Sequence, residues 1–164
     1  MTGIDPGAVA GPVVGIGVDA VDVERLRTVL GRRSGMAGRL FTDGERAYAG
    51  RAADPAPRLA TRFAAKEATM KALGVGLGAF RFDEVEVVRV GLEAPSLVLH
   101  GSAAERAERS GITRWHLSLT HTDATALAFV VAEAAVAADG RTTAPTTAPT
   151  AAPTTVPPPA VPTF

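Results

Sequence analysis

The segment RLATRFAAKEATMKALG, residues 58–74, carries the strongest structural signal in the chain. It has no glycine or proline before its last residue, and Leu59, Phe63 and Met70 recur at the spacing of one helix face. Two prolines closely precede it and Gly74 ends it, which is typical of the start and the end of a helix. We therefore predict a helix of about four turns that packs one face against a core.

The charged residues of this predicted helix point to chemistry. Lys66 and Lys71 are the only lysines among the 17 basic residues of the chain. An ammonium group has a pKa that responds to its surroundings, whereas a guanidinium group stays charged. Glu67 lies one turn before Lys71, so the two side chains can meet. The helix alone is compatible with a catalytic set and also with an ordinary solvated ion pair.

A second informative segment is VVGIGVDAV, residues 13–21, whose alternation predicts a strand. Gly15, Gly17 and Asp19 fall on one face of this strand. The two glycines leave space beside the Asp19 carboxylate for a ligand or for a closely approaching backbone. The alternative is that Asp19 merely turns or caps the chain where the strand ends.

A basic helix is predicted directly after this strand, with Asp22 as its N-cap and its end near residue 33. Arg25 and Arg32 are seven residues apart and share one flank of the helix. They form either a surface for an acidic partner or an ordinary solvated face near the negative end of the helix dipole.

Shorter signals place the remaining elements. Ser/Thr-x-x-Glu sequences at residues 42–45 and 102–105 predict capping boxes at the start of two short helices. Residues 35–38 are predicted to form a loop. Strands are predicted at 82–90, from residue 95 to 100, and as a hairpin at 115–122 and 126–132.

His121 stands near the turn of that hairpin, a position where functional residues often lie. The alternative is that it is simply a surface histidine.

Composition limits the class of protein and its partners. A chain of 164 residues fits one domain, and the absence of cysteine excludes disulfides and thiolate metal sites. A formal net charge of zero does not favour nucleic acid, and no apolar run is long enough to span a membrane. We predict a flexible N-terminus (1–12), one folded domain (13–138) and a disordered Thr/Ala/Pro-rich tail (139–164).

The segments GIGVDAVDVERL, FTDGERAYA, TRFAAKEATMKALG and WHLSLTHTDATALAFVV occur in this order, and with them the chain resembles the holo-[acyl-carrier-protein] synthases. These are small 4′-phosphopantetheinyl transferases. The resemblance implies an α+β fold with small antiparallel sheets around a long central helix. It also implies a cytoplasmic homotrimer with active sites between subunits.

The activity implied by the resemblance is the transfer of 4′-phosphopantetheine from coenzyme A to a serine of apo acyl carrier protein. The reaction depends on Mg²⁺, releases 3′,5′-ADP and supports fatty acid biosynthesis. By matching positions, the resemblance implies that Asp19 and Glu67 are the magnesium ligands and that Glu67 and Lys71 are the catalytic residues. Two carboxylates that act together with substrate phosphates suit magnesium.

The resemblance gives these residues the following roles. Lys71 neutralises the diphosphate or protonates the departing phosphate, and Glu67 is the base, directly or through water. The positions that match coenzyme A contacts are Arg62, Lys66, His121, Thr122 and Pro95. Those assigned to the carrier protein are Arg25 and Arg32.

Two other classes of function stay open at this stage. One is a coenzyme A or nucleotide binder with the same fold and no transfer activity, and the other is an interaction protein built on the basic helix and the tail. No residue expected for the chemistry is missing, which argues against the first. The chain departs from the family in its tail and in the turn Gly91-Leu-Glu-Ala-Pro95, which is longer than the usual Gly-Xaa-Pro.

Overall fold

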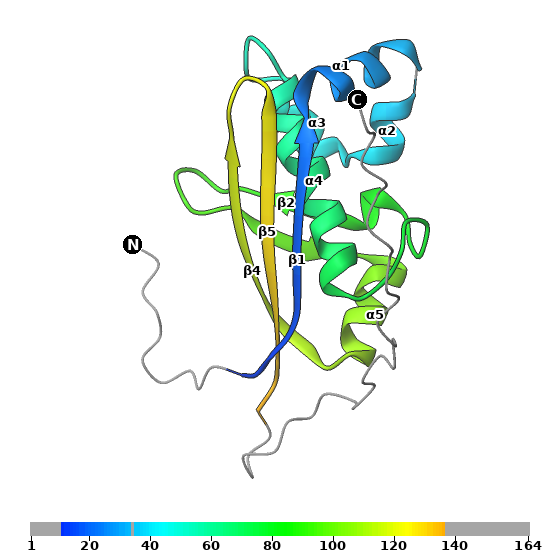
Figure 1. Cartoon of the computed structure of the whole chain (residues 1–164), viewed down its shortest axis with the longest axis vertical. Helices are drawn as coiled ribbons and strands as arrows, with labels where there is room; N and C mark the ends of the chain where they lie inside the picture. Colours follow the sequence, from blue (N-terminus) through cyan, green and yellow to red (C-terminus); the bar gives the residue numbers. More distant parts are fainter. Residues whose placement is uncertain (1–10, 34, 137–164) are drawn as a thin grey trace, which may run out of the picture.

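Two antiparallel sheets pack against one long helix in the computed structural model, which describes residues 11–33 and 35–136 (Figure 1). One sheet has three strands in the order β1-β5-β4, and the other pairs β2 with β3. In chain order the elements are β1 (Val13–Asp22), α1 (Val23–Arg32), α2 (Met36–Leu40), α3 (Asp43–Ala49), α4 (Ala56–Ala72), the 3₁₀ turn η1 (Phe82–Glu84), β2 (Val85–Val88), β3 (Ser96–Leu99), α5 (Gly101–Arg109), β4 (Ile112–His121) and β5 (Thr125–Ala134). The α+β class expected from the sequence is confirmed.

Some predictions fall beyond the described residues. The predicted tail, 139–164, and all but the last two residues of the predicted N-terminal segment lie outside them. None of the helices within the described ranges combines the length and the apolar character that a membrane span requires.

Helix α4 takes the central position because small side chains let both sheets come close to it. Its alanines interlock with short residues of β5 and with one valine of β2. The buried residues of this layer are Ala64, Ala65, Ala68, Ala72, Val87, Ala128 and Val130. The interior is thus close-packed through short side chains, a kind of packing that leaves little room for added atoms.

The contact between β1 and α4 is closer still, because two glycines face the helix backbone. A Cβ atom added to Gly17 would lie 1.8 Å from the carbonyl oxygen of Ala68. One added to Gly15 would lie 2.1 Å from the carbonyl oxygen of Ala72. Of the two uses predicted for the space beside Asp19, close approach of a backbone is therefore confirmed for both glycines.

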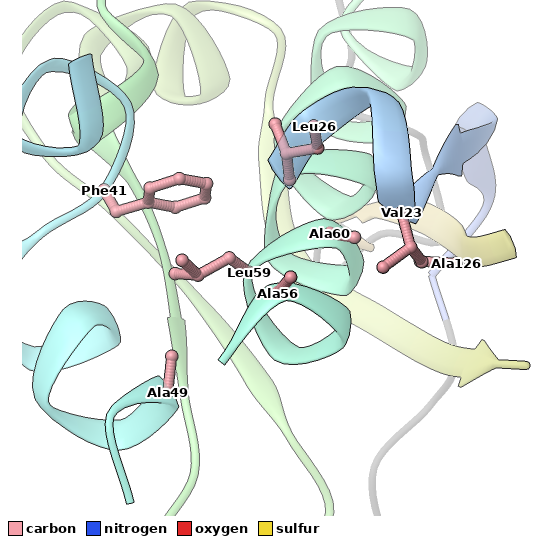
Figure 2. Packing of buried hydrophobic residues seen from close by; sticks show 8 residues of the cluster. All are labelled: Val23, Leu26, Phe41, Ala49, Ala56, Leu59, Ala60 and Ala126. Atoms are coloured by element: carbon pink, nitrogen blue, oxygen red, sulfur yellow. The ribbon is translucent and has the colours of Figure 1, made fainter. Parts of the chain in front are cut away.

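A second buried cluster joins α1, α3 and the start of α4 at one end of the molecule (Figure 2). Phe41 lies in this cluster with 1% of its surface exposed, and the capping box between Thr42 and Glu45 begins α3 directly after it. Asp22 accepts a hydrogen bond of 2.7 Å from the backbone of Arg25 and caps α1. Both caps agree with the sequence prediction.

Two local predictions are wrong near α2 and β2. The predicted loop at residues 35–38 contains the start of α2, because Gly35 reverses the chain with a φ of 82° and the helix begins at the next residue. The predicted strand at 82–90 begins as the turn η1. The Lys66 ammonium group binds the carbonyl oxygens of Phe82 and Val85, which holds the chain in that turn before the strand starts.

The second predicted capping box is also wrong. Helix α5 begins at Gly101, its N-cap is His100, and no side chain of the cap residue bonds to the helix. The Ser102 hydroxyl instead donates a hydrogen bond of 2.6 Å to Glu84 of η1. The Glu84 carboxylate also accepts a hydrogen bond of 3.1 Å from the backbone N–H of Ala103, so a carboxylate from another element replaces the local cap, which the local sequence cannot reveal.

The face of the three-stranded sheet opposite α4 exposes large apolar side chains. The helices lie on the other side of this sheet in Figure 1. Val18 of β1 stands beside Phe129 of β5 in the sheet register. We call this surface the outer sheet face, and its exposed apolar residues are Val14, Ile16, Val18, Leu127 and Phe129. A contiguous apolar surface of this kind marks an interaction site.

Candidate active site

A carboxylate and an ammonium group from different elements meet between β1 and α4. The Lys71 Nζ atom lies 2.7 Å from the Asp19 Oδ1 atom and 2.8 Å from the carbonyl oxygen of Val18. Asp19 is 8% exposed, whereas the Lys71 side chain remains half-exposed. Lys71 therefore meets a residue distant in sequence, in addition to sharing a helix face with Glu67.

Glu67 lies close enough to Asp19 for the two carboxyl groups to affect each other. Burial and the charge of Asp19 raise the pKa of Glu67, and the charge of Lys71 opposes part of that rise. We call Asp19 and Glu67 the carboxylate pair. Two carboxylates in one partly buried place repel each other, so the arrangement favours a bound proton or a bound cation.

One atom of the carboxylate pair lacks a partner. The Asp19 Oδ2 atom is buried and accepts no hydrogen bond from the described residues. Such an atom is costly unless a ligand compensates it. The described residues contain no cluster of three or more His, Cys, Asp or Glu able to hold a metal ion. A pair of carboxylates is the donor set of a cation that takes one or two carboxylates and completes its shell with water and phosphate oxygens, as magnesium does.

A pocket of about 580 Å³ lies apart from the carboxylate pair. It is formed where α3, the start of α4, the turn after β2 and the end of β4 meet. Its lining includes three of the predicted coenzyme A contacts, namely Arg62, Pro95 and His121. Neither member of the carboxylate pair lines it. Thr122 is exposed, and its backbone N–H closes the β4–β5 turn on the carbonyl oxygen of Thr125 at 2.8 Å.

Sequence reasoning missed three residues of this pocket, Tyr48, Arg58 and Arg89. Both Arg58 and Arg62 place a guanidinium group over the Tyr48 ring, at 4.9 and 4.2 Å from its centroid. The Arg89 Nη1 atom lies 3.4 Å from the Tyr48 hydroxyl. We call these four residues the arginine–tyrosine cluster. A sequence signal existed only in the RLATR spacing, which puts two arginines one helical turn apart.

Lys66 does not line this pocket, and its assignment to coenzyme A stays a prediction. Its side chain is fully buried, and its Nζ atom lies 2.7 Å from the Glu45 carboxylate. Burial lowers the pKa of Lys66, and the charge of Glu45 opposes that shift. Glu45 also accepts a hydrogen bond of 3.0 Å from the backbone N–H of Val87. This pair joins α3, α4 and β2, so we assign Lys66 a structural role.

The exposed surface of α1 carries the arginines assigned to the carrier protein. Arg25 and Arg32 are both exposed, and neither forms an ion pair within the described part of the chain. Arg27 differs, because Asp54 and Glu24 bind its guanidinium group at 2.8 and 2.9 Å. The helix therefore offers two uncompensated positive charges on one surface, which is the arrangement that an acidic partner requires.

Comparison with known proteins identifies the family. Residues 15–132 match the model of the 4′-phosphopantetheinyl transferase superfamily, a span that contains the carboxylate pair and the pocket. The chain belongs to this superfamily of enzymes.

Within the superfamily, its relatives are holo-[acyl-carrier-protein] synthases. One from Frankia alni is 49% identical over 121 residues, which cover 74% of this chain and 98% of the relative. The solved structure from Neisseria meningitidis has a TM-score of 0.68 and 36% identity, and the match covers 74% of this chain and 99% of that one. The structure from Bacillus anthracis, in complex with coenzyme A (3′,5′-ADP), has a TM-score of 0.62 and 31% identity, with 75% and 98% covered. The resemblance inferred from the motifs is confirmed.

Proposed function

We propose that this protein transfers 4′-phosphopantetheine from coenzyme A to a serine of apo acyl carrier protein in the cytoplasm, with Mg²⁺ as cofactor and 3′,5′-ADP as the second product. The reaction would serve fatty acid biosynthesis. The observation that carries the proposal is the carboxylate pair with its unpartnered oxygen beside Lys71, in a chain of this family. This is the kind of site in which a diphosphate can be held and cleaved.

Each residue of the site has its own role in the transfer reaction. Asp19 and Glu67 would hold the magnesium ion, which when bound supplies positive charge against the diphosphate. The serine oxygen forms a bond to the β-phosphorus, and the bond from that phosphorus to the bridging oxygen breaks. Glu67, directly or through water, takes the serine proton, which suits a carboxylate whose pKa burial raises. Lys71 stabilises the negative charge or donates a proton to the departing 3′,5′-ADP.

The pocket supplies the coenzyme A contacts of the proposal. A volume of about 580 Å³ suits part of a nucleotide-sized ligand. Arg62 and His121 would bind the 3′-phosphate, with Pro95 and Thr122 near the adenine. The Bacillus anthracis relative was solved in complex with coenzyme A (3′,5′-ADP), which supports coenzyme A as the ligand. The longer turn before Pro95 still brings this proline into the pocket lining.

The assembly proposed is a homotrimer with active sites between subunits. Two features support it. Within one chain, neither Asp19 nor Glu67 lines the pocket. The outer sheet face leaves β1 and β5 without cover from the described helices. If copies meet through this face, the pocket of one copy can complete the carboxylate pair of its neighbour.

The assembly can be tested with Phe129→Glu, since Phe129 is 40% exposed near the middle of the outer sheet face. A charge buried at each contact should convert the trimer to monomers at micromolar concentration and remove most of the transfer activity. Light scattering after size-exclusion chromatography gives the mass. Leu77→Glu is the control, because Leu77 is 71% exposed and lies in the loop after α4. A Phe129→Glu protein with unchanged mass would contradict the proposed interface.

The carrier protein would dock on α1 through Arg25 and Arg32. An acidic helix of a partner fits two exposed arginines that have no carboxylate of their own within the described residues. Carrier binding that did not depend on Arg25 would favour the alternative of a general interaction protein.

The function itself is tested by mass spectrometry of a carrier protein. The full chain is incubated with apo acyl carrier protein, coenzyme A and Mg²⁺, and the carrier should gain the mass of phosphopantetheine. The gain should vanish with EDTA and with Glu67→Ala, whereas the exposed control Glu108→Ala should retain it. No gain with several apo carriers, from a folded protein that binds coenzyme A, would leave the chain a non-catalytic binder.

A further inference from the structure

We propose that the ion pair between Arg27 and Asp54 is a positioning element for the carrier protein. It fixes helix α1 against the start of α4, so that Arg25 and Arg32 present a preorganised surface to an acidic partner helix. The identity of the partner rests on the proposed function. The assignment of Arg27 and Asp54 rests on the contacts that these two side chains form.

The Arg27 guanidinium group forms a two-pronged contact with the Asp54 carboxylate. Its Nη1 and Nη2 atoms donate hydrogen bonds of 2.8 Å each to Oδ1 and Oδ2 of Asp54, and its Nε atom donates one of 2.9 Å to Glu24. The bond from Arg27 lowers the pKa of Asp54 to about 2, and the two carboxylates raise the pKa of Arg27. A planar fork that meets both oxygens of a carboxylate fixes direction as well as distance.

Asp54 is itself held in place, because it belongs to the turn that begins α4. Its Oδ1 atom accepts a hydrogen bond of 3.0 Å from the backbone N–H of Ala56, the first residue of that helix. A side-chain bond to the backbone two residues further on stabilises such a turn. Since α4 also carries Glu67 and Lys71, the ion pair connects α1 to the helix of the candidate active site.

The second half of α1 depends on this pair because its apolar packing is sparse. Val23 and Leu26 are buried against the first turns of α4, whereas Leu30 is only partly buried. No residue of α1 after Leu26 is buried. Arg32 ends the helix beyond its well-packed half, so the contact at Arg27 restrains the part of α1 that the core holds least.

Rotation of α1 about its axis would displace the basic surface. At about 100° per residue, Arg25 and Arg32 lie roughly 140–160° around the helix from Arg27. Their charged groups stand at the ends of long side chains, far from the axis, so a small rotation moves them further than it moves the buried stripe. A fixed Arg27 therefore fixes the direction in which both arginines point.

The charge of Asp54 gives this inference a distinctive sign. Asn at position 54 makes the surroundings of α1 more positive, which should favour an acidic partner if net charge alone determined affinity. Positioning requires the opposite result, because Arg27 loses the second prong of its contact. Asp54→Asn keeps a side-chain oxygen for the Ala56 N–H, so the turn before α4 is retained.

The test measures the binding of apo acyl carrier protein to the full chain by calorimetry. Asp54→Asn should raise the Kd about threefold, the size expected for one exposed ion pair. Arg27→Lys keeps the net charge but cannot form the fork, and it should raise the Kd about twofold. In transfer assays the KM for the carrier should rise by the same factors, while kcat and the KM for coenzyme A stay nearly unchanged.

Two further variants calibrate these effects. Glu105→Gln is the matched control, because Glu105 is an exposed carboxylate that pairs with Arg109 in α5, at the opposite end of the molecule from α1 (Figure 1). It removes the same charge as Asp54→Asn and should leave the Kd at the wild-type value. Arg25→Gln removes a docking charge and should raise the Kd about tenfold. Should Asp54→Asn fail to fold, Arg27→Lys carries the test on its own.

The outcomes distinguish this inference from the proposed function. If Arg25→Gln raises the Kd but Asp54→Asn lowers it or leaves it unchanged, the inference is overturned and docking on α1 stands. A KM for coenzyme A that rises as much as the KM for the carrier also overturns it, since the pair then supports the whole fold. If Arg25→Gln has no effect, docking on α1 fails and the inference fails with it. If the protein shows no transfer, but the carrier binds and its Kd rises in Asp54→Asn and Arg27→Lys, the inference stands and the proposed reaction fails.

Discussion

Asp19→Asn should lower kcat/KM for phosphopantetheine transfer by at least about a thousandfold while the protein remains folded. The substitution keeps the shape of the side chain and an oxygen that can accept the hydrogen bond from Lys71, which lies at 2.7 Å in the native chain. It removes the charge of a buried group with one unpartnered oxygen. Loss of that charge should also raise the Mg²⁺ concentration needed for half-maximal rate.

The measurement is the initial rate of carrier-protein modification at several Mg²⁺ concentrations, together with the thermal midpoint. The midpoint should change little, because the variant loses one of two carboxylates that repel each other. Glu67→Gln should cause a loss of similar size, and the double variant should be little worse than either single one, since the two residues act as a unit. Glu108→Gln is the control for loss of an exposed carboxylate. A rate for Asp19→Asn within tenfold of the wild type would exclude a catalytic carboxylate pair.

Gly17→Ala should destabilise the protein by about 3 kcal/mol, a large stability effect for one methyl group. The added carbon would lie 1.8 Å from the Ala68 carbonyl oxygen, and neither backbone can move without separating β1 from α4. Because Asp19 lies two residues further along β1, the same displacement should reduce transfer in whatever protein still folds.

Urea unfolding followed by circular dichroism gives the free energy of unfolding for this comparison. Gly31→Ala is the matched control, since an added Cβ there meets no atom within 4 Å. It lies in α1, where alanine should stabilise the helix by about 0.5–1 kcal/mol. A cost below about 1 kcal/mol for Gly17→Ala would show that β1 and α4 can separate easily.

The sequence predicted the elements whose signals are local. The predicted helix at 58–74 corresponds to α4 at Ala56–Ala72, because its apolar spacing lies within the segment and the prolines that mark its start directly precede it. The hairpin of β4 and β5 and the faces of β1 follow from alternation along the chain. Asp19 and Glu67 were paired through the family resemblance, and their role as magnesium ligands stays a prediction.

Features that depend on distant residues escaped prediction. The ion pair of Lys66 was not foreseen, because its partner Glu45 is 21 positions away, on a helix whose placement against α4 only the fold determines. The arginine–tyrosine cluster draws on α3, α4 and the end of β2, so no short segment contains it. The turn η1 replaced part of a strand for a similar reason, since the group that binds its carbonyl oxygens belongs to α4.

Helix α4 carries Arg62 on the side of the pocket and Glu67 on the side of β1, only five residues apart. If copies assemble as proposed, each α4 serves two neighbouring active sites, giving phosphate contacts to one and a carboxylate to the other. In a mixed assembly, a subunit altered only at Arg62 still supplies Glu67, and a subunit altered only at Glu67 still supplies Arg62. One active site between two such subunits would therefore keep both residues. Two inactive alleles could then restore activity together, so that loss of function in this gene would depend on which pair of alleles a cell carries.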